Sequence, residues 1–225
     1  MINKIRNYIN KDIISYAHID ELLDRDFTII YASDTGFIIK DNLVNFIYIS
    51  FSDFEEMKKE LSKKRYDHYL AYEKEIVDFY GDSGKTTNLI QYVYTSKEKF
   101  DIGDYDIRVL DESYEDRINS IYKALGPGES ILNTLKEKKV IGLFIENKLA
   151  GFIGRHPEGC MGMLYVFEEY RGHKYGEILE KAMINKLLDE NQKIIDEVIE
   201  GNTVSFKLQD KLGLVKGKKK IYWLL

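Results

Sequence analysis

The residue types that are scarce in this sequence exclude several classes of protein and of site. The chain of 225 residues has one cysteine, so it forms no internal disulfide and has no cysteine cluster for a zinc ion. Two prolines are too few for a proline-rich linker. No run of about 18 apolar residues occurs, and segment 1–14 is too polar for a signal peptide. We therefore expect a cytoplasmic protein with no metal site and no membrane contact.

Basic residues are also not in excess. The net charge is −5 at pH 7, which argues against general binding to nucleic acid or to anionic lipid. Apolar residues make up 44% of the chain, so it is globular, and its length permits one large domain or two small ones.

Glycine is concentrated in the second half, where twelve of the sixteen glycines lie between Gly126 and the end. This predicts tight turns and close backbone approaches there. Apolar runs predict strands at 140–145, 149–155, 159–166, 194–200 and 219–225. Helical spacing and capping residues predict helices at 111–125, 129–138 and 203–212.

The stretch 161–180 is the most informative. Met161–Val166 reads as a strand, and a turn with Arg171 and two glycines follows it. Apolar residues at i, i+3, i+4, i+7 and i+8 from Tyr175 then predict an amphipathic helix. The free N–H groups at such a helix start, with an arginine beside them, favour an anion.

This order resembles the acyl-CoA motif of the GNAT acetyltransferases, strand–[Q/R]-x-x-G-x-[G/A]–helix. Arg171 and Gly176 fit its ends, while Lys174 replaces the middle glycine. Segment 200–214 is similar to the family's second motif, through Asn202, Ser205, Leu208, Lys211 and Gly213. The resemblance implies an α/β GNAT fold: a mixed, mostly antiparallel sheet with one splayed parallel strand pair and helices on both faces.

The resemblance also implies a site for acetyl-CoA as co-substrate. Backbone groups of Val166 and Phe167 would contact the pantetheine arm. Asn202 and Ser205 would assist it, although a plain helix N-cap explains Asn202 equally well. The turn that would hold the pyrophosphate consists of Arg171, Gly172, His173, Lys174, Tyr175 and Gly176.

At position 174 a lysine adds positive charge near the phosphates, but its Cβ is costly if the backbone needs a positive φ. In the family this turn is mostly right-handed helix, which predicts that the side chain is tolerated. A solvent-facing lysine is the alternative. His173 is expected to act as a backbone donor rather than as an acid or base.

The family's usual catalytic groups are missing. The strand before the turn has no carboxylate, and Gln209 stands where relatives have tyrosine. The candidates left for acid or base are His156, Glu158, Glu200 and Tyr165, and a structural or solvated role is the expected one for each. Cys160 is expected to be a buried small residue rather than an acyl carrier.

The sequence pattern of the first half predicts its secondary structure less clearly. Strands are expected at 26–33, 36–40, 44–51, 68–71 and 88–94, and helices at 53–64, capped by Ser52, and at 73–79. Segment 36–47 aligns with 142–153 at five identities in twelve. Either two hairpins share turn chemistry, or the first half is a degenerate GNAT-like copy, as in glycine N-acyltransferase-like proteins.

We therefore predict a substrate-shaping domain at residues 1–103 and a GNAT acetyl-CoA domain at residues 104–225. The predicted function is N-acetyl transfer to a small amine by direct attack. The alternatives are a glycine N-acyltransferase-type enzyme or an acyl-CoA-binding module without turnover. GNAT domains often pair, so a homodimer is possible, but nothing in the sequence marks an interface. GDSGKTT, residues 81–87, resembles a P-loop but lacks its first glycine, and a solvated turn is expected there.

Overall fold

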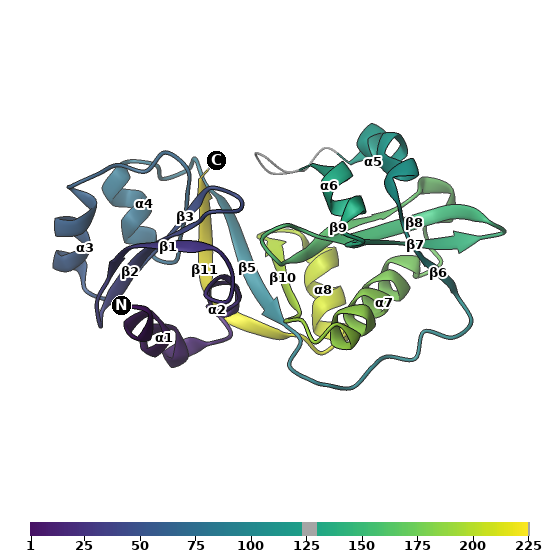
Figure 1. The fold of residues 1–225 in the computed structure, drawn as a ribbon, viewed down its shortest axis with the longest axis horizontal. Coiled ribbons are helices and arrows are strands. Elements are labelled where there is room, and N and C mark those ends of the chain that lie inside the picture. The colour runs from purple at the N-terminus through teal and green to yellow at the C-terminus, as the bar shows by residue number, and fades with distance from the viewer. Residues whose placement is uncertain (123–129, 225) are drawn as a thin grey trace. The chain divides into compact units, whose positions relative to one another are not determined.

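The computed structural model describes residues 1–122 and 130–224 (Figure 1). The chain divides into two compact units. Unit 1 comprises residues 1–93 and 197–225, and unit 2 comprises residues 94–196. The last segment of the chain thus groups with the N-terminal residues, whereas the predicted division at residue 103 keeps it with the preceding ones. No helix in the described ranges is long and apolar enough to cross a membrane.

Unit 1 is a six-stranded sheet with helices on both faces. Its sheet order is β1-β2-β3-β4-β11-β5, in which β3 and β4 are parallel and the other neighbours are antiparallel. The strands are β1 (Phe27–Ala32), β2 (Gly36–Asp41), β3 (Phe46–Phe51), β4 (Tyr69–Ala71), β5 (Thr87–Val93) and β11 (Val215–Leu224). The helices are α1 (Ile2–Ile9), η1 (Asn10–Asp12), α2 (Ala17–Leu22), α3 (Phe54–Leu61), α4 (Lys74–Tyr80) and α8 (Thr203–Lys211).

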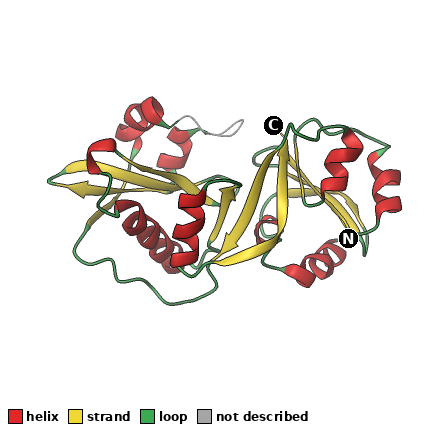
Figure 2. Cartoon of the chain, turned by 180° about the vertical axis from the view of Figure 1, so that it is seen from behind, coloured by secondary structure: helices red, strands yellow, loops and turns green. Residues whose placement is uncertain are grey.

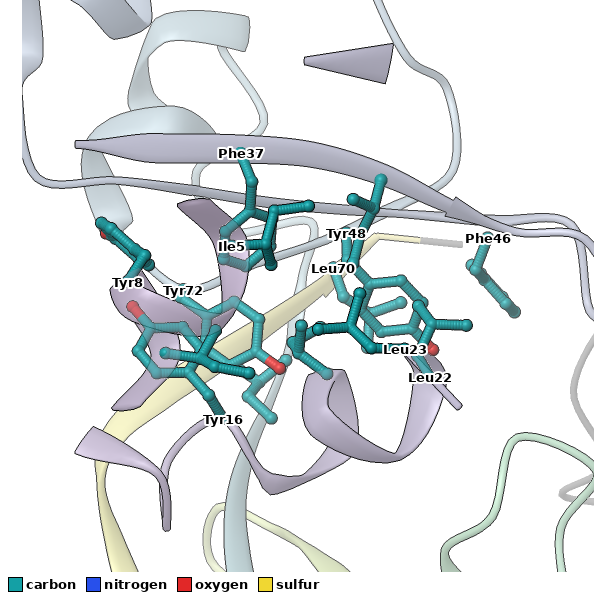
Figure 3. Close-up of a cluster of buried hydrophobic side chains, with 14 of the residues drawn as sticks. Ile5, Tyr8, Tyr16, Leu22, Leu23, Phe37, Phe46, Tyr48, Leu70 and Tyr72 are labelled. Carbon is teal, nitrogen blue, oxygen red and sulfur yellow. The ribbon is translucent and has the colours of Figure 1, made fainter. Parts of the chain in front are cut away.

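Apolar side chains on the two faces of this sheet form separate clusters. On one face α1 and α2 cover a cluster in which Tyr8, Tyr16 and Phe37 meet edge to face (Figure 3). On the other face α3 and α4 cover a second cluster around Ile49 and Tyr69 (Figures 1 and 2). The alternation of buried side chains along β2 and β3 places them on both faces.

Polar contacts hold β11 within unit 1. The Lys219 ammonium lies 2.7 Å from the Glu73 carboxylate, which also accepts hydrogen bonds from the Ser50 hydroxyl and the Phe51 N–H. Burial raises the pKa of Glu73 above its usual value despite the nearby ammonium. The Ser15 hydroxyl accepts the Lys218 N–H at 2.8 Å. These partners fix the register of a strand that comes from the far end of the sequence.

Unit 2 contains the predicted anion turn. The strands β6 (Asp106–Val109), β7 (Val140–Ile145), β8 (Lys148–Arg155) and β9 (Met161–Val166) form an antiparallel run. β10 (Ile195–Ile199) pairs in parallel with β9, and its last three residues belong to unit 1. The helices are η2 (Glu112–Tyr114), α5 (Glu115–Ile121), α6 (Ile131–Lys136), η3 (Glu168–Tyr170) and α7 (Tyr175–Asp189).

Helices cover both faces of this sheet as well (Figure 1). α5 and α6 pack on an apolar cluster that includes Phe152, whereas α7 lies over the opposite face. A Cβ at Gly151 would come 3.0 Å from Leu179 of α7 and 2.7 Å from the Tyr165 carbonyl oxygen. This glycine therefore permits the close approach of α7 to the sheet.

The predicted fold class is confirmed, with differences in several elements. The N-terminal helices α1 and α2 and the strand β6 were not predicted. Asp53, rather than Ser52, caps α3, because its side chain accepts the Glu56 N–H. The predicted helices 111–125 and 129–138 are shorter in the described residues, at η2–α5 and α6, and parts of both predictions, with the turn between them, lie outside those residues.

The order of elements repeats. β3-α3-β4-α4-β5 has the same order as β9-α7-β10-α8-β11. The sequence echo instead matches the hairpin β2–β3 with β7–β8, so it is displaced from this repeat by one strand. The two hairpins also differ in their turns. Glu146 and Asn147, both with a positive φ, join β7 to β8, whereas residues 42–45 join β2 to β3 and among these Asn45 has a positive φ.

Candidate functional site

The strand β9 bends at a bulge. Met163 has a φ of 56°, and the β8–β9 register shifts at the same place. β10 is in register with β9 only at Asp196 and Met161, just before the bulge. Beyond that pair, β9 has no other registered β10 partner in the described part of the chain. The predicted splayed strand pair is therefore present, and it leaves backbone groups of β9 available.

Two left-handed residues shape the turn after β9. Gly172 has a φ of 84° and Lys174 a φ of 63°, and α7 begins only at Tyr175. The expectation that residue 174 lies in a right-handed turn is wrong, because Lys174 is the N-cap and adopts the conformation that glycine prefers. The family's glycine at this position thus has a conformational reason.

Consecutive amides in this turn are free. The backbone N–H groups of five residues donate no hydrogen bond to any residue that the structure describes: Gly172, His173, Lys174, Tyr175 and Gly176. The helix that follows has 15 residues, and no side chain caps its start. Successive free N–H groups around two left-handed residues form an anion-binding concavity, and the helix dipole adds to it.

Arg171 lies at the mouth of this turn. Its side chain is exposed, its Nε donates to the Val166 carbonyl at 3.1 Å, and its guanidinium lies over the Tyr165 ring at 5.6 Å. Glu168 and Glu169 are exposed nearby, so their charges offset those of Arg171 and Lys174. The preference for an anion thus rests on the oriented N–H groups rather than on net charge.

The backbone groups of Val166, at the end of β9, and of Phe167, just after it, point to opposite edges of the strand. The Phe167 N–H donates to the Ala150 carbonyl of β8 at 3.0 Å, so it is already engaged. Backbone groups of successive strand residues point to opposite edges, which directs those of Val166 away from β8. Of the two residues predicted to contact pantetheine, Val166 has the suitable orientation.

The remaining turn residues support backbone binding. The exposed His173 ring stacks on Tyr175 with centroids 5.4 Å apart, and its amide is among the free ones. A Cβ at Gly176 would only contact Leu164 and Val166 at 3.8 and 3.9 Å. Asn202 and Ser205 lie in unit 1, where the Asn202 side chain accepts the Ser205 N–H at 3.1 Å and caps α8.

His156 and Glu158 lie in the β8–β9 turn. The Gly159 N–H donates to the His156 carbonyl, and the His156 N–H donates to Cys160, which is buried as predicted. The His156 ring lies over Gly162, where an added Cβ would come 2.5 Å from Nε2. His156 therefore packs against β9 one residue before the bulge, at the end opposite the anion turn.

Glu200 is unsuited to act as a base. Its carboxylate pairs with Lys220 and accepts a hydrogen bond from the Asn88 amide at 3.0 Å, all within unit 1. The hydrogen bond from Lys220 lowers the pKa of this exposed carboxyl below its usual value. A carboxylate stabilised in its charged form is a weaker proton acceptor.

A buried histidine in unit 1 was not singled out from the sequence. His18 of α2 is almost fully buried, and its Nδ1 lies 2.8 Å from Glu197, one residue after the β9–β10 pair. Its Nε2 lies 3.1 Å from the Tyr48 hydroxyl. These residues are far apart in sequence, so only the polar His18 within an apolar helical stretch could have indicated them.

One family model matches part of the chain. Residues 140–224 match the profile of the FR47-like protein family, which is related to the GNAT acetyltransferases. No curated protein matches the chain.

Several solved structures are similar over nearly the full length. A Drosophila structural-genomics target has a TM-score of 0.73 at 13% identity, covering 99% of this chain and 95% of its own. A GNAT-family acetyltransferase from Colwellia psychrerythraea has a TM-score of 0.58 at 11% identity, covering 99% of this chain and 95% of its own. A GCN5-related N-acetyltransferase from Kribbella flavida has a TM-score of 0.56 at 10% identity, covering 94% of this chain and 93% of its own. These identities establish a shared fold, and the resemblance predicted from the sequence is confirmed at that level.

Proposed function

Because this chain has the fold of the GNAT superfamily, we propose that it is an N-acetyltransferase that takes acetyl-CoA as donor. The observation that carries the proposal is the run of five free amide N–H groups from Gly172 to Gly176 at the start of α7. Such a site suits a pyrophosphate, because oriented N–H groups bind an anion without reorganisation.

The strand before the turn supports the same donor. Beyond Met161, β9 has no registered β10 partner among the described residues, so this edge can pair with the amides of a pantetheine arm as a strand would. The Val166 carbonyl on this edge accepts the Arg171 Nε–H, which leaves its N–H for the arm. An arm that starts at the anion turn and runs back along β9 brings its thioester toward Gly162. Five residues separate Gly162 from Phe167, which is about 17 Å in a strand.

The proposed reaction is direct transfer in a ternary complex. The nitrogen of a neutral primary amine attacks the thioester carbonyl, the carbon–sulfur bond breaks, and CoA leaves as a thiolate that takes up a proton. The amine loses one proton, so a nearby base assists. We assign this proton transfer to His156, since its ring lies against β9 where the thioester would reach.

The acceptor is proposed to be a small amine. The net charge of −5 favours a cationic acceptor, which must lose its proton before attack. Unit 1 is proposed to help shape the acceptor site. Transfer of longer acyl groups and binding without turnover are the competing functions, and both are outcomes of the experiment below.

Thermal unfolding with and without acetyl-CoA tests the donor site. A ligand at 100 times its Kd stabilises by about 2.7 kcal/mol. For a chain of this size the expected shift in Tm is roughly 5–10 °C. Gly172→Glu should abolish the shift, because it puts a carboxylate among the free N–H groups.

Gly84→Glu is the matched control. Gly84 also has a positive φ, of 81°, and open space around it, so the change brings the same strain and charge outside the site. It should retain the full ligand shift. Equal shifts in both variants would overturn the donor site. A ligand shift without thiol release across amine acceptors would indicate a binding module, and release only with longer acyl donors would indicate the other enzyme.

A further inference from the structure

A pocket lies at the end of α7 opposite the anion turn, within unit 2. It has a volume of about 290 Å³ and is formed by the last turns of α7, the loop before β7 and the end of β8. Met183 and Leu187 line it, and each is only 1% exposed. The volume is just below the usual range of about 300–1,000 Å³ for ligand pockets, which suits a small metabolite.

Positive charge predominates around this pocket. Four cations line it, Lys138, Lys139, Arg155 and Lys186, against two carboxylates, Glu137 and Glu190. Lys138 forms no ion pair with a residue in the described ranges. The pocket therefore carries an excess of positive charge, and Met183 and Leu187 are the two apolar residues of its lining.

The two paired lysines are more buried than their partners. The Lys139 side chain is 28% exposed and that of its partner Glu137 56%. The Lys186 side chain is 21% exposed and that of its partner Glu190 45%. Exposed pairs of this kind contribute little free energy, so the carboxylates can move into solvent when another anion enters.

The Arg155 guanidinium donates hydrogen bonds to two uncharged oxygen atoms, among its other contacts. Its Nε donates to the Gly159 carbonyl at 2.9 Å, and its Nη1 donates to the Gln192 side chain at 3.1 Å. The side chain is buried, and these contacts fix the plane of the guanidinium at the wall. A fixed guanidinium is well suited to an oxyanion.

The C-terminal end of a helix normally disfavours an anion. Here the Lys186 and Leu187 carbonyls are already engaged, because they accept the N–H groups of Glu190 and Gln192. The four cations therefore outweigh the remaining dipole at this end of α7.

We propose that this pocket binds a small organic anion, a phosphate monoester or a carboxylate with an apolar group. The apolar group would lie on Met183 and Leu187, and the oxyanion would meet Lys139, Lys186 and Arg155. Residues 176 and 190 are about 21 Å apart along the helix, so this site is separate from the anion turn. It does not depend on the proposed acetyl transfer.

Calorimetric titration with phenyl phosphate, benzoate and inorganic phosphate tests the proposal. We expect saturable binding of one equivalent of phenyl phosphate or benzoate, and weaker binding of inorganic phosphate, which lacks the apolar group. The stronger of the two organic probes identifies the oxyanion. Lys186→Met, which keeps the aliphatic stem, should weaken binding about tenfold or more.

Two further variants define the site. Lys148→Met removes an exposed lysine of the β7–β8 hairpin in the same unit. This variant should bind phenyl phosphate and benzoate with the affinity of the unchanged chain. Gly172→Glu locates the probe, because it should leave probe binding at this pocket unchanged but would weaken a probe bound to the free N–H groups of the anion turn. Absence of binding by both organic probes, or equal affinity in Lys186→Met and Lys148→Met, would overturn the proposal.

Discussion

His156 is the residue whose position gives it a role in the proposed chemistry. Its ring lies against Gly162, one residue before the bulge of β9, whereas Glu200 is paired with Lys220 in unit 1. The site thus offers an imidazole where the family's strand carboxylate is missing. An imidazole exchanges protons near neutral pH, as a base for an amine requires.

We expect His156→Gln to lower turnover by about a hundredfold, which is within the usual contribution of a general base. The acetyl-CoA shift in Tm should remain, because the anion turn is unchanged. The rate of thiol release against pH is the measurement: the loss of rate toward low pH should be present in the unchanged chain and absent in the variant.

Glu200→Gln serves as the comparison for that experiment. It should keep both the rate and the pH profile, since the Lys220 contact already holds this carboxylate in its charged form. If Glu200→Gln lost activity while His156→Gln retained it, the assignment of the base to His156 would be wrong.

At the scale of elements, α7 connects the two ends of unit 2. Its first residues form the anion turn, and its last turns line the cationic pocket. The close approach at Gly151 sets the distance between the helix and the sheet. The start of the helix is strained, because Lys174 is left-handed there.

Lys174→Gly should therefore stabilise the protein. The left-handed conformation costs an L-residue about 1–2 kcal/mol. Glycine also increases the conformational entropy of the unfolded chain, which offsets roughly 0.5–1 kcal/mol of this gain. The expected net increase in the free energy of unfolding is about 0.5–1 kcal/mol. Urea unfolding measures it. Lys174→Ala keeps the Cβ and should give no gain, and an equal gain in both variants would contradict this explanation.

At the scale of the whole molecule, the two halves of the chain repeat one order of elements but differ in their binding features. β3 and β4 are in register at three consecutive pairs, whereas β9 and β10 meet at one. The start of α3 carries Asp53, Glu55 and Glu56, and carboxylates there repel a phosphate. Among the described residues, the first half thus has neither the splay nor the anion turn, and the proposed donor site lies in the second half.

β11 links the end of the chain to unit 1. It lies between β4 and β5, and Ile221 and Leu224 belong to the clusters on opposite faces of that sheet. A chain that ends at Leu214 should lose hydrogen-exchange protection in β4 and β5, because a central strand is missing. Protection of α7 and β9 in unit 2 should persist.

Ile221→Ala is a milder test of the same dependence. It keeps the strand but removes a fully buried side chain, at a cost of about 2–5 kcal/mol. The loss of protection should again be greatest in unit 1. Unchanged protection of β4 and β5 in both variants would show that β11 does not stabilise this sheet.

Local signals predicted much of the second half of the chain. The period of Ile178, Leu179 and their neighbours predicted α7, and Asn202 with Gly213 predicted the limits of α8. α1 also has apolar residues at helical spacing, but its short length made it a weak signal. The left-handed Lys174 could not be predicted, because the sequence gives no glycine there and the surrounding turn imposes the conformation.

The sequence by itself determined the GNAT fold class, the anion turn and its order between strand and helix, because these depend on residues close together in the chain. Only the tertiary structure decided where β11 pairs, which amides stay free, how β9 bends at Met163, and that His156 covers Gly162. Those features depend on contacts between distant segments, and packing free energy, rather than local propensity, selects among the alternatives.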